Sequence, residues 1–314
     1  AEYFPKKDRA FSTSIFNSGA TIGAMIAPAC ILYIAEAFGW EASFIIIGVL
    51  GFIWMGFWVF IYKKPEVHPK VNQAELTYIQ QDRQEEKRDE TTEKKLSFLQ
   101  CFRFKQTWAF AFGKFMTDGV WWFFLFWMPK YLQTSFGLEG TAQVLPLTIL
   151  YAIVMLSIIG GWLPSYFIDK KGMNPYAGRM KSMLIFAFFP LLALFAQPLG
   201  AYSYWLPVIL IGIAAAAHQA WSANIFSTIG DMFPKTAIAT ITGIGGMAGG
   251  VGSYFIQSGA GKLFDHAGRT GMNFLGFSGE PAGYFIVFIF CAIAYLIGWV
   301  VMKALVPKYK PIEV

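Results

Sequence analysis

The sequence predicts an all-α fold, a polytopic membrane helix bundle, and three observations support this class. Hydrophobic residues make up 56% of the 314 residues, and charged residues only 14%. The mean hydropathy is +0.48, whereas a soluble domain usually has about a quarter of its residues charged. The apolar residues also form long runs, and a run of about eighteen or more is typical of a transmembrane helix. These runs are too long and too uniformly apolar for the strands of a membrane barrel.

We expect eight membrane helices, separated by short loops and by one long charged segment. Their expected ranges are 11–34, 43–62, 108–132, 143–168, 181–197, 204–229, 237–261 and 283–304. The charged segment leaves two helices before it and six after it. The sequence therefore predicts three parts: 1–62, the last two helices of an amino-terminal half; 63–107, a cytoplasmic linker; and 108–314, a complete six-helix carboxyl-terminal half.

The distribution of basic residues predicts the orientation of these helices. Alternate loops fall on opposite sides of a membrane, and Lys and Arg are enriched on the cytoplasmic side. One side receives almost all of them: Lys6, Lys7, Arg9, the segment 63–107, Lys170, Lys171, Arg179, Lys181, Lys235, Lys303, Lys308 and Lys310. Both ends of the chain are therefore expected in the cytoplasm. The net charge of +6 is explained by these loops, so nucleic acid is not expected as a partner.

An internal similarity predicts that the chain is a fragment. Residues 4–30 resemble residues 233–259: both begin Phe-Pro-Lys, and Gly23 aligns with Gly252. Four predicted helices precede the second copy, and none precedes the first. If the halves are built alike, four helices are missing at the amino end. Parallel six-helix halves are an architecture of secondary transporters.

Enzymatic chemistry has no support in the residue pattern. The segment 256–263 fails the phosphate-loop pattern, because Ile256 stands where glycine is required and leucine follows the lysine. The cysteines Cys30, Cys101 and Cys291 are far apart, and the three histidines show no metal-ligand spacing. We expect no catalytic residues, no metal and no cofactor.

Polar and aromatic residues interrupt the third predicted helix, GKFMTDGVWWFFLFW. Lys114 and Asp118 are one helical turn apart and can pair, and Trp121 lies on the same face. Asp118, Trp121 and Trp122 are candidates for contact with a substrate, because aromatic rings stack on the C–H faces of a sugar. Two alternatives remain: a local salt bridge near the cytoplasmic end, and Trp122 as an interfacial anchor.

The sixth predicted helix, AAAAHQAWSANIFSTIGDMFP, is the most polar stretch within a span. His218, Trp221 and Asn224 share one arc at 100° per residue and are predicted to face a cavity. Gln219 lies almost opposite Trp221, as a second contact or an interhelical hydrogen bond. Hydrogen-bonded packing is the alternative for His218.

Small and polar residues also mark the first and seventh predicted helices. Asn17 shares a face with Thr21 and is a candidate cavity residue, with a hydrogen bond to a neighbouring helix as the alternative. The seventh helix has glycines that predict close helix packing: Gly245, Gly246, Gly249 and Gly250.

Three of these stretches together resemble a known family. KKDRAFSTSIFNSGATIGAMIAP, GKFMTDGVWWFFLFWMPKYL and HQAWSANIFSTIGDMFP are similar to the major facilitator superfamily. They most resemble its anion:cation symporter branch, and within that branch the hexuronate transporters. The resemblance runs from residue 2 to about residue 306.

This resemblance implies a monomeric, twelve-helix transporter with alternating access in a bacterial inner membrane. Its partners would be the lipid bilayer, a sugar acid such as galacturonate or glucuronate, and a coupling proton. The eight spans would be the last eight of twelve, and the main carboxylate-binding and proton-coupling residues would lie on earlier helices. Substrate contacts would come from Asn17, from the face Asp118–Trp122 and from the face His218–Asn224. A non-transporting solute sensor or scaffold that signals through segment 63–107 is the alternative.

Overall fold

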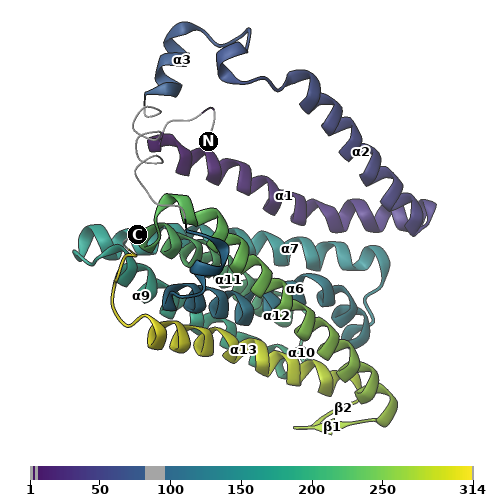
Figure 1. Cartoon of the computed structure of the whole chain (residues 1–314). Coiled ribbons are helices and arrows are strands. Elements are labelled where there is room, and N and C mark those ends of the chain that lie inside the picture. The colour runs from purple at the N-terminus through teal and green to yellow at the C-terminus, as the bar shows by residue number, and fades with distance from the viewer. Residues whose placement is uncertain (1–2, 4–5, 82–95, 313–314) are drawn as a thin grey trace. The chain divides into compact units, whose positions relative to one another are not determined.

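The computed structural model confirms the all-α fold class. It describes residues 3, 6–81 and 96–312, without the side chains of 6–18, 20, 21 and 235. Strand structure within these residues is limited to a two-residue antiparallel pair, β1 (Asn273–Phe274) and β2 (Phe277–Ser278). The chain divides into two compact units, Ala1–Glu93 and Lys94–Val314, and Figure 1 labels most of their helices.

The first unit contains a pair of long helices in contact with each other. These are α1 (Lys6–Phe38) and α2 (Trp40–Ile61). Gly39 joins them with a φ of +87°, a conformation that glycine adopts without steric cost. A 3₁₀ turn (Pro65–Val67) and the short helix α3 (Gln73–Gln80) follow.

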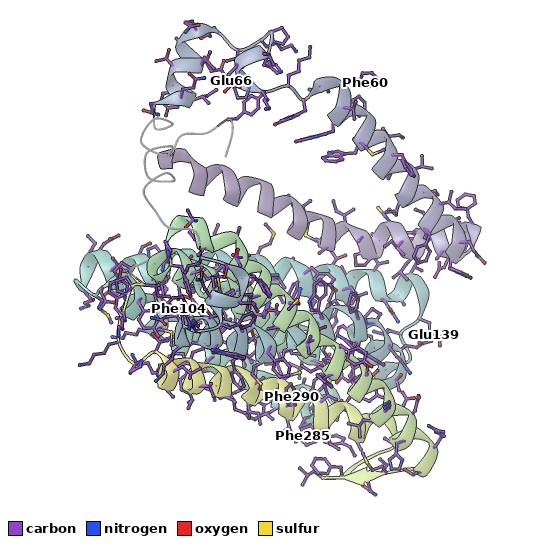
Figure 2. All side chains as sticks on the ribbon, viewed as in Figure 1. Phe60, Glu66, Phe104, Glu139, Phe285 and Phe290 are labelled. Carbon is purple, nitrogen blue, oxygen red and sulfur yellow. The ribbon has the colours of Figure 1, made fainter. Side chains whose placement is uncertain are left out.

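The surface of α2 is apolar around its whole circumference. Its side chains stand out from the ribbon, and Phe60 is 83% exposed (Figure 2). A helix that is hydrophobic all round is typical of a membrane span or of a buried core helix.

The second unit contains six long helical segments within residues 96–312, after the short helix α5 (Phe98–Cys101). The first is α6 (Lys105–Phe136), and the last three are α11 (Trp205–Met232), α12 (Lys235–Thr270) and α13 (Glu280–Leu305). The loop before α13 holds β1 and β2, whose Phe274 and Phe277 contact Phe285 of α13 (Figure 2).

The remaining two segments are interrupted helices. One runs from a 3₁₀ turn (Gly140–Gln143) through α7 (Val144–Val154), a second 3₁₀ turn (Met155–Ile158) and α8 (Ile159–Ser165) to a π-helical turn (Tyr166–Lys170). The other joins α9 (Pro175–Phe188), a 3₁₀ stretch (Phe189–Phe195) and α10 (Ala196–Gly200). Pro164 and Pro190 lie in these segments. Proline lacks the amide hydrogen of the helical ladder, which explains local departures from α-geometry.

Helix α6 packs along α12, with glycines at the contact. A Cβ added at Gly245, Gly249 or Gly252 would meet, respectively, the ring of Phe110, the carboxylate of Asp118 or the main chain of Phe115. Small residues let helix backbones approach closely in membranes. The predicted close packing is thus confirmed for Gly245 and Gly249, whereas Gly246 and Gly250 face open space.

The other contacts complete the bundle of the second unit. Helix α11 packs against α7, α8 and α9 and also contacts α6. Helix α13 packs against α6, α9 and α12. Helix α6 therefore contacts both α11 and α13, and the predicted polar residues of 114–122 and 218–224 lie on α6 and α11.

Residues 306–312, which we call the carboxyl-terminal strap, run back across the ends of three other helices. The hydroxyl of Tyr176 in α9 donates a hydrogen bond to the carbonyl of Val306 over 2.6 Å. Three further hydrogen bonds attach the strap: Gln106 Nε2 to Lys310 O at 2.9 Å, Tyr309 Oη to Asp231 O at 3.1 Å, and Ile312 N to Met232 O at 2.8 Å. The last two satisfy carbonyls at the end of α11, which a helix leaves without intrahelical partners.

Each of the eight expected spans coincides with one long helical segment. Five segments in the described part of the chain are long and apolar enough to cross a membrane: Trp40–Ile61, Gly140–Lys170, Pro175–Gly200, Trp205–Met232 and Glu280–Leu305. The span prediction stays a prediction for α1, α6 and α12, and so do the limits of the three predicted parts. Within the predicted charged linker 63–107, residues 82–95 lie outside the described residues.

Candidate functional site

Lys114 and Asp118 form an ion pair in the amino-terminal half of α6. The distance from Lys114 Nζ to Asp118 Oδ2 is 2.8 Å, and the two side chains are 6% and 15% exposed. The predicted pairing across one helical turn is therefore confirmed. Lys114 Nζ also lies 4.3 Å from the ring centre of Phe226 in α11. The lysine of the pair therefore faces α11, and Asp118 lies beside Gly249 of α12.

Trp121, three residues after Asp118, stacks on His218 of α11. Their ring centres are 5.3 Å apart, and their planes differ by only 11°. Trp121 is half-buried and His218 is buried. The structure therefore joins the two predicted faces, one on α6 and one on α11, through a single aromatic stack.

Tyr295 of α13 completes this cluster and is a residue that sequence reasoning missed. Its hydroxyl lies 2.7 Å from His218 Nδ1 and donates to the carbonyl of Thr117 at 3.4 Å. Its ring also meets Trp221 edge-on, with centres 5.5 Å apart. The only signal in the sequence was a hydroxyl-bearing residue in an otherwise apolar run, and tyrosine usually finds a hydrogen-bond partner when buried.

Trp221 and Asn224 lie inside the packed bundle. Trp221 is fully buried, and Asn224 is 1% exposed. The amide of Asn224 donates to the carbonyl of Gly160 in α8 at 2.8 Å, so this residue also makes the interhelical contact of a packing residue. Trp221 Nε1 and Asn224 Oδ1 have no hydrogen-bond partner among the described residues. The structure shows no opening at either side chain, and their contact with a substrate stays a prediction.

Three further residues were predicted as substrate contacts: Gln219, Trp122 and Asn17. Gln219 is half-buried, and Trp122 is 38% exposed, with its ring stacked on that of Phe126 at 5.4 Å. Asn17 lies in α1, where its side chain is outside the described residues. Among the residues that the structure describes, no three His, Cys, Asp or Glu side chains come together as a metal site would require.

The cluster combines charged, polar and aromatic side chains. Lys114 supplies a cation and Asp118 an anion, while Trp121 supplies a broad apolar face. Ionisable residues within membrane segments are costly and usually pair or border a wet cavity.

Comparison of the whole chain with known proteins identifies its family. Residues 1–256 match the family model described as Major Facilitator Superfamily. The chain belongs to the Major Facilitator Superfamily. It is therefore a transporter and a multi-pass membrane protein, and it is not an enzyme.

Several curated proteins similar to this chain are bacterial transporters of sugar acids by name. The "Hexuronate transporter" of Escherichia coli (strain K12) is 28% identical over 309 residues, which are 96% of this chain and 67% of the relative. The "Galacturonate transporter" of Dickeya chrysanthemi is 30% identical over 181 residues, 57% of this chain and 52% of the relative. The "D-galactonate transporter" of Escherichia coli O6:H1 is 25% identical over 276 residues, 83% and 61%. The matched part spans about half to two thirds of these relatives.

Proposed function

We propose that this protein belongs to a secondary transporter that imports a sugar acid, a hexuronate such as galacturonate or glucuronate, by proton symport. The similarity to the E. coli hexuronate transporter over 96% of the chain carries this proposal. We propose that the protein acts in the bacterial inner membrane, with both ends of this chain in the cytoplasm. We also propose that it is monomeric.

The polar cluster supports the proposal through its chemistry. A hexuronate has one carboxylate, several hydroxyls and a C–H face. Trp121 offers an aromatic face to the ring, and Gln219 offers an amide to a hydroxyl. The Lys114 ammonium attracts a carboxylate, although Asp118 competes for it at 2.8 Å. The substrate would bind between two six-helix halves and bias their movement between outward-open and inward-open states.

Trp121 tests the site better than Trp221 does. Trp221 is fully buried, and truncating a buried tryptophan costs about 3–5 kcal/mol of stability, so its loss would report on packing. Trp121 is half-buried and is better suited to contact a ligand. We expect Trp121→Ala to raise the KM for galacturonate about tenfold, since aromatic stacking contributes on the order of 1 kcal/mol or more.

The direct test is counterflow in proteoliposomes that contain the full-length protein. Vesicles preloaded with unlabelled galacturonate should accumulate labelled galacturonate, and glucuronate should compete whereas neutral galactose should not. An imposed inward proton gradient should accelerate net uptake, and a protonophore should abolish that acceleration. A protein that binds galacturonate without exchanging it would be a sensor, and the transport proposal would fail.

A further inference from the structure

Tyr295 of α13 lies where α6, α11 and α13 meet, and it contacts one residue of α6 and two residues of α11. Its side chain is fully buried. The hydroxyl contacts His218 Nδ1 at 2.7 Å and the carbonyl of Thr117 at 3.4 Å, and the ring edge meets Trp221. A buried hydroxyl with two polar partners on two other helices does more than fill space.

The two hydrogen bonds fix the direction in which the protons point. A carbonyl oxygen only accepts, so the Tyr295 O–H donates to Thr117 O. The hydroxyl oxygen then accepts from His218, which places the imidazole proton on Nδ1 and leaves Nε2 as the acceptor of the neutral ring. The arrangement that satisfies both contacts therefore selects one tautomer and one ring orientation of His218.

The orientation of His218 in turn decides where Trp121 can lie. The two rings are stacked, with planes within 11° of parallel, so rotation of the imidazole would break the stack. Trp121 is half-buried and follows Asp118 by three residues, so its indole stands beside the ion pair on one side of α6. Tyr295 is thus linked to Trp121 through a single intermediate residue.

We propose that Tyr295 is a positioning residue, whose hydroxyl orients His218 so that His218 holds Trp121 as an aromatic platform beside Lys114 and Asp118. The part of the inference that concerns the sugar rests on the proposed function. The part that concerns Trp121 does not, because the hydrogen bond and the stack need no ligand. A merely structural Tyr295 would act through its ring, which packs on Trp221.

The variant Tyr295→Phe separates the two roles, because it keeps the ring and removes only the hydroxyl. Tyr131→Phe is the matched control. Tyr131 lies on α6, is 1% exposed, and its hydroxyl has no hydrogen-bond partner among the described residues. Both variants therefore remove one buried oxygen, but only one of them removes a contact to His218.

The first measurement is made without substrate in the purified full-length protein. The fluorescence of Trp121 is obtained as the difference between each protein and the same protein carrying Trp121→Phe, and its quenching by acrylamide is measured. We expect Tyr295→Phe to increase the quenching of Trp121, because the indole is no longer held against His218, and Tyr131→Phe to leave it unchanged. Unchanged quenching in Tyr295→Phe overturns the positioning role, whatever the protein transports.

The second measurement is galacturonate uptake into proteoliposomes. Loss of one hydrogen bond is expected to raise KM about two- to tenfold in Tyr295→Phe, with Vmax per folded protein unchanged. A structural defect would instead lower Vmax, through fewer active molecules, and leave KM unchanged; that pattern would overturn the proposal. Absence of uptake in the unmodified protein would refute the proposed function and leave the fluorescence result standing.

A second variant keeps the inference testable if Tyr295→Phe does not fold. His218→Phe retains a ring that can stack on Trp121 but has no Nδ1 hydrogen to give, so it should increase acrylamide quenching of Trp121 as Tyr295→Phe does. Where both variants fold, the double variant should show no more quenching than either single one, because they remove the same hydrogen bond. Additive effects, or normal quenching in His218→Phe, would contradict the proposed chain from Tyr295 to Trp121.

Discussion

A lysine and an aspartate one turn apart in α6 reduce the free-energy cost of burying each other's charge. A single charge at the centre of a membrane helix costs roughly 2.5–3.5 kcal/mol on insertion scales. The Lys114–Asp118 pair at 2.8 Å offsets part of this cost, and the contact of Lys114 with the Phe226 ring adds a cation–π interaction. Each charge is therefore tolerated because the other is present.

Removing one partner of this pair should destabilise the protein more than removing both. We expect Lys114→Met or Asp118→Asn alone to lower stability by about 3 kcal/mol, because each leaves an uncompensated buried charge. The double variant should recover much of this loss, which thermal unfolding in detergent would measure as a positive coupling in a double-mutant cycle. Additive losses would show that the pair is not energetically coupled.

The pairing of Lys114 with Asp118 could be predicted because both residues lie on one helix at a known spacing. The stack of Trp121 on His218 could not, because helical periodicity says which residues share a face and not which faces meet. Tyr295 was missed for the same reason: its partner His218 is separated from it by 77 positions. The sequence also could not show that Trp221 and Asn224 are sealed in the bundle, because a cavity-facing arc and a packed arc have the same periodicity.

At the scale of elements, the contact between α6 and α12 depends on the absence of side chains at particular turns. A Cβ at Gly252 would collide with the main chain of Phe115, which cannot rotate away, whereas Gly250 has no atom within 4 Å of its added Cβ. The same glycine-rich run therefore contains both a packing position and an open position.

Substitution of these two glycines by alanine should have opposite effects. Gly252→Ala should destabilise the protein by about 1–3 kcal/mol through overpacking against α6. Gly250→Ala should be neutral or stabilising by up to about 1 kcal/mol, because alanine favours the helix. Thermal unfolding of the two variants decides this, and equal stability would mean that α6 and α12 lie further apart than described.

The carboxyl-terminal strap stabilises the ends of the helices it crosses. Tyr176→Phe would leave the carbonyl of Val306 without its 2.6 Å hydrogen bond, which we expect to cost about 1–3 kcal/mol because both groups are buried. The control Tyr131→Phe removes a hydroxyl that has no partner among the described residues and should be close to neutral. A loss no larger than that of the control would show that the strap contributes little.

At the scale of the whole molecule, the sequence predicted which segments are helical and could not predict their interruptions. The apolar runs placed all eight long helical segments, because run length and hydropathy are local properties. The 3₁₀ and π-helical turns around Pro164 and Pro190 depend on packing as well as on proline, so no local pattern predicts them. The strap was likewise beyond prediction, since its contacts join residues far apart in the sequence, from 78 positions for Tyr309 and Asp231 to 204 for Gln106 and Lys310.

The two compact units differ in how much of their apolar helix surface is buried. In the first unit, none of the apolar window of α2 is buried, whereas about half of the window in α13 is buried within the second unit. Polar and ionisable groups, by contrast, gather where α6, α11 and α13 meet. We propose that this face of the bundle borders the substrate path, since Asp118 and Trp121 are half-buried there and are not sealed inside the bundle.

Substrate protection of a cysteine at position 121 tests most directly whether this cluster borders the path of a sugar acid. The variant Trp121→Cys would be made in a full-length protein carrying Cys30→Ser, because Cys30 is exposed while Cys101 and Cys291 are buried. We predict that a membrane-impermeant thiol reagent labels the new cysteine in proteoliposomes and that galacturonate, but not galactose, slows the labelling. Labelling at the same rate with and without galacturonate, or no labelling from either side of the membrane, would contradict the assignment of this cluster to the substrate path.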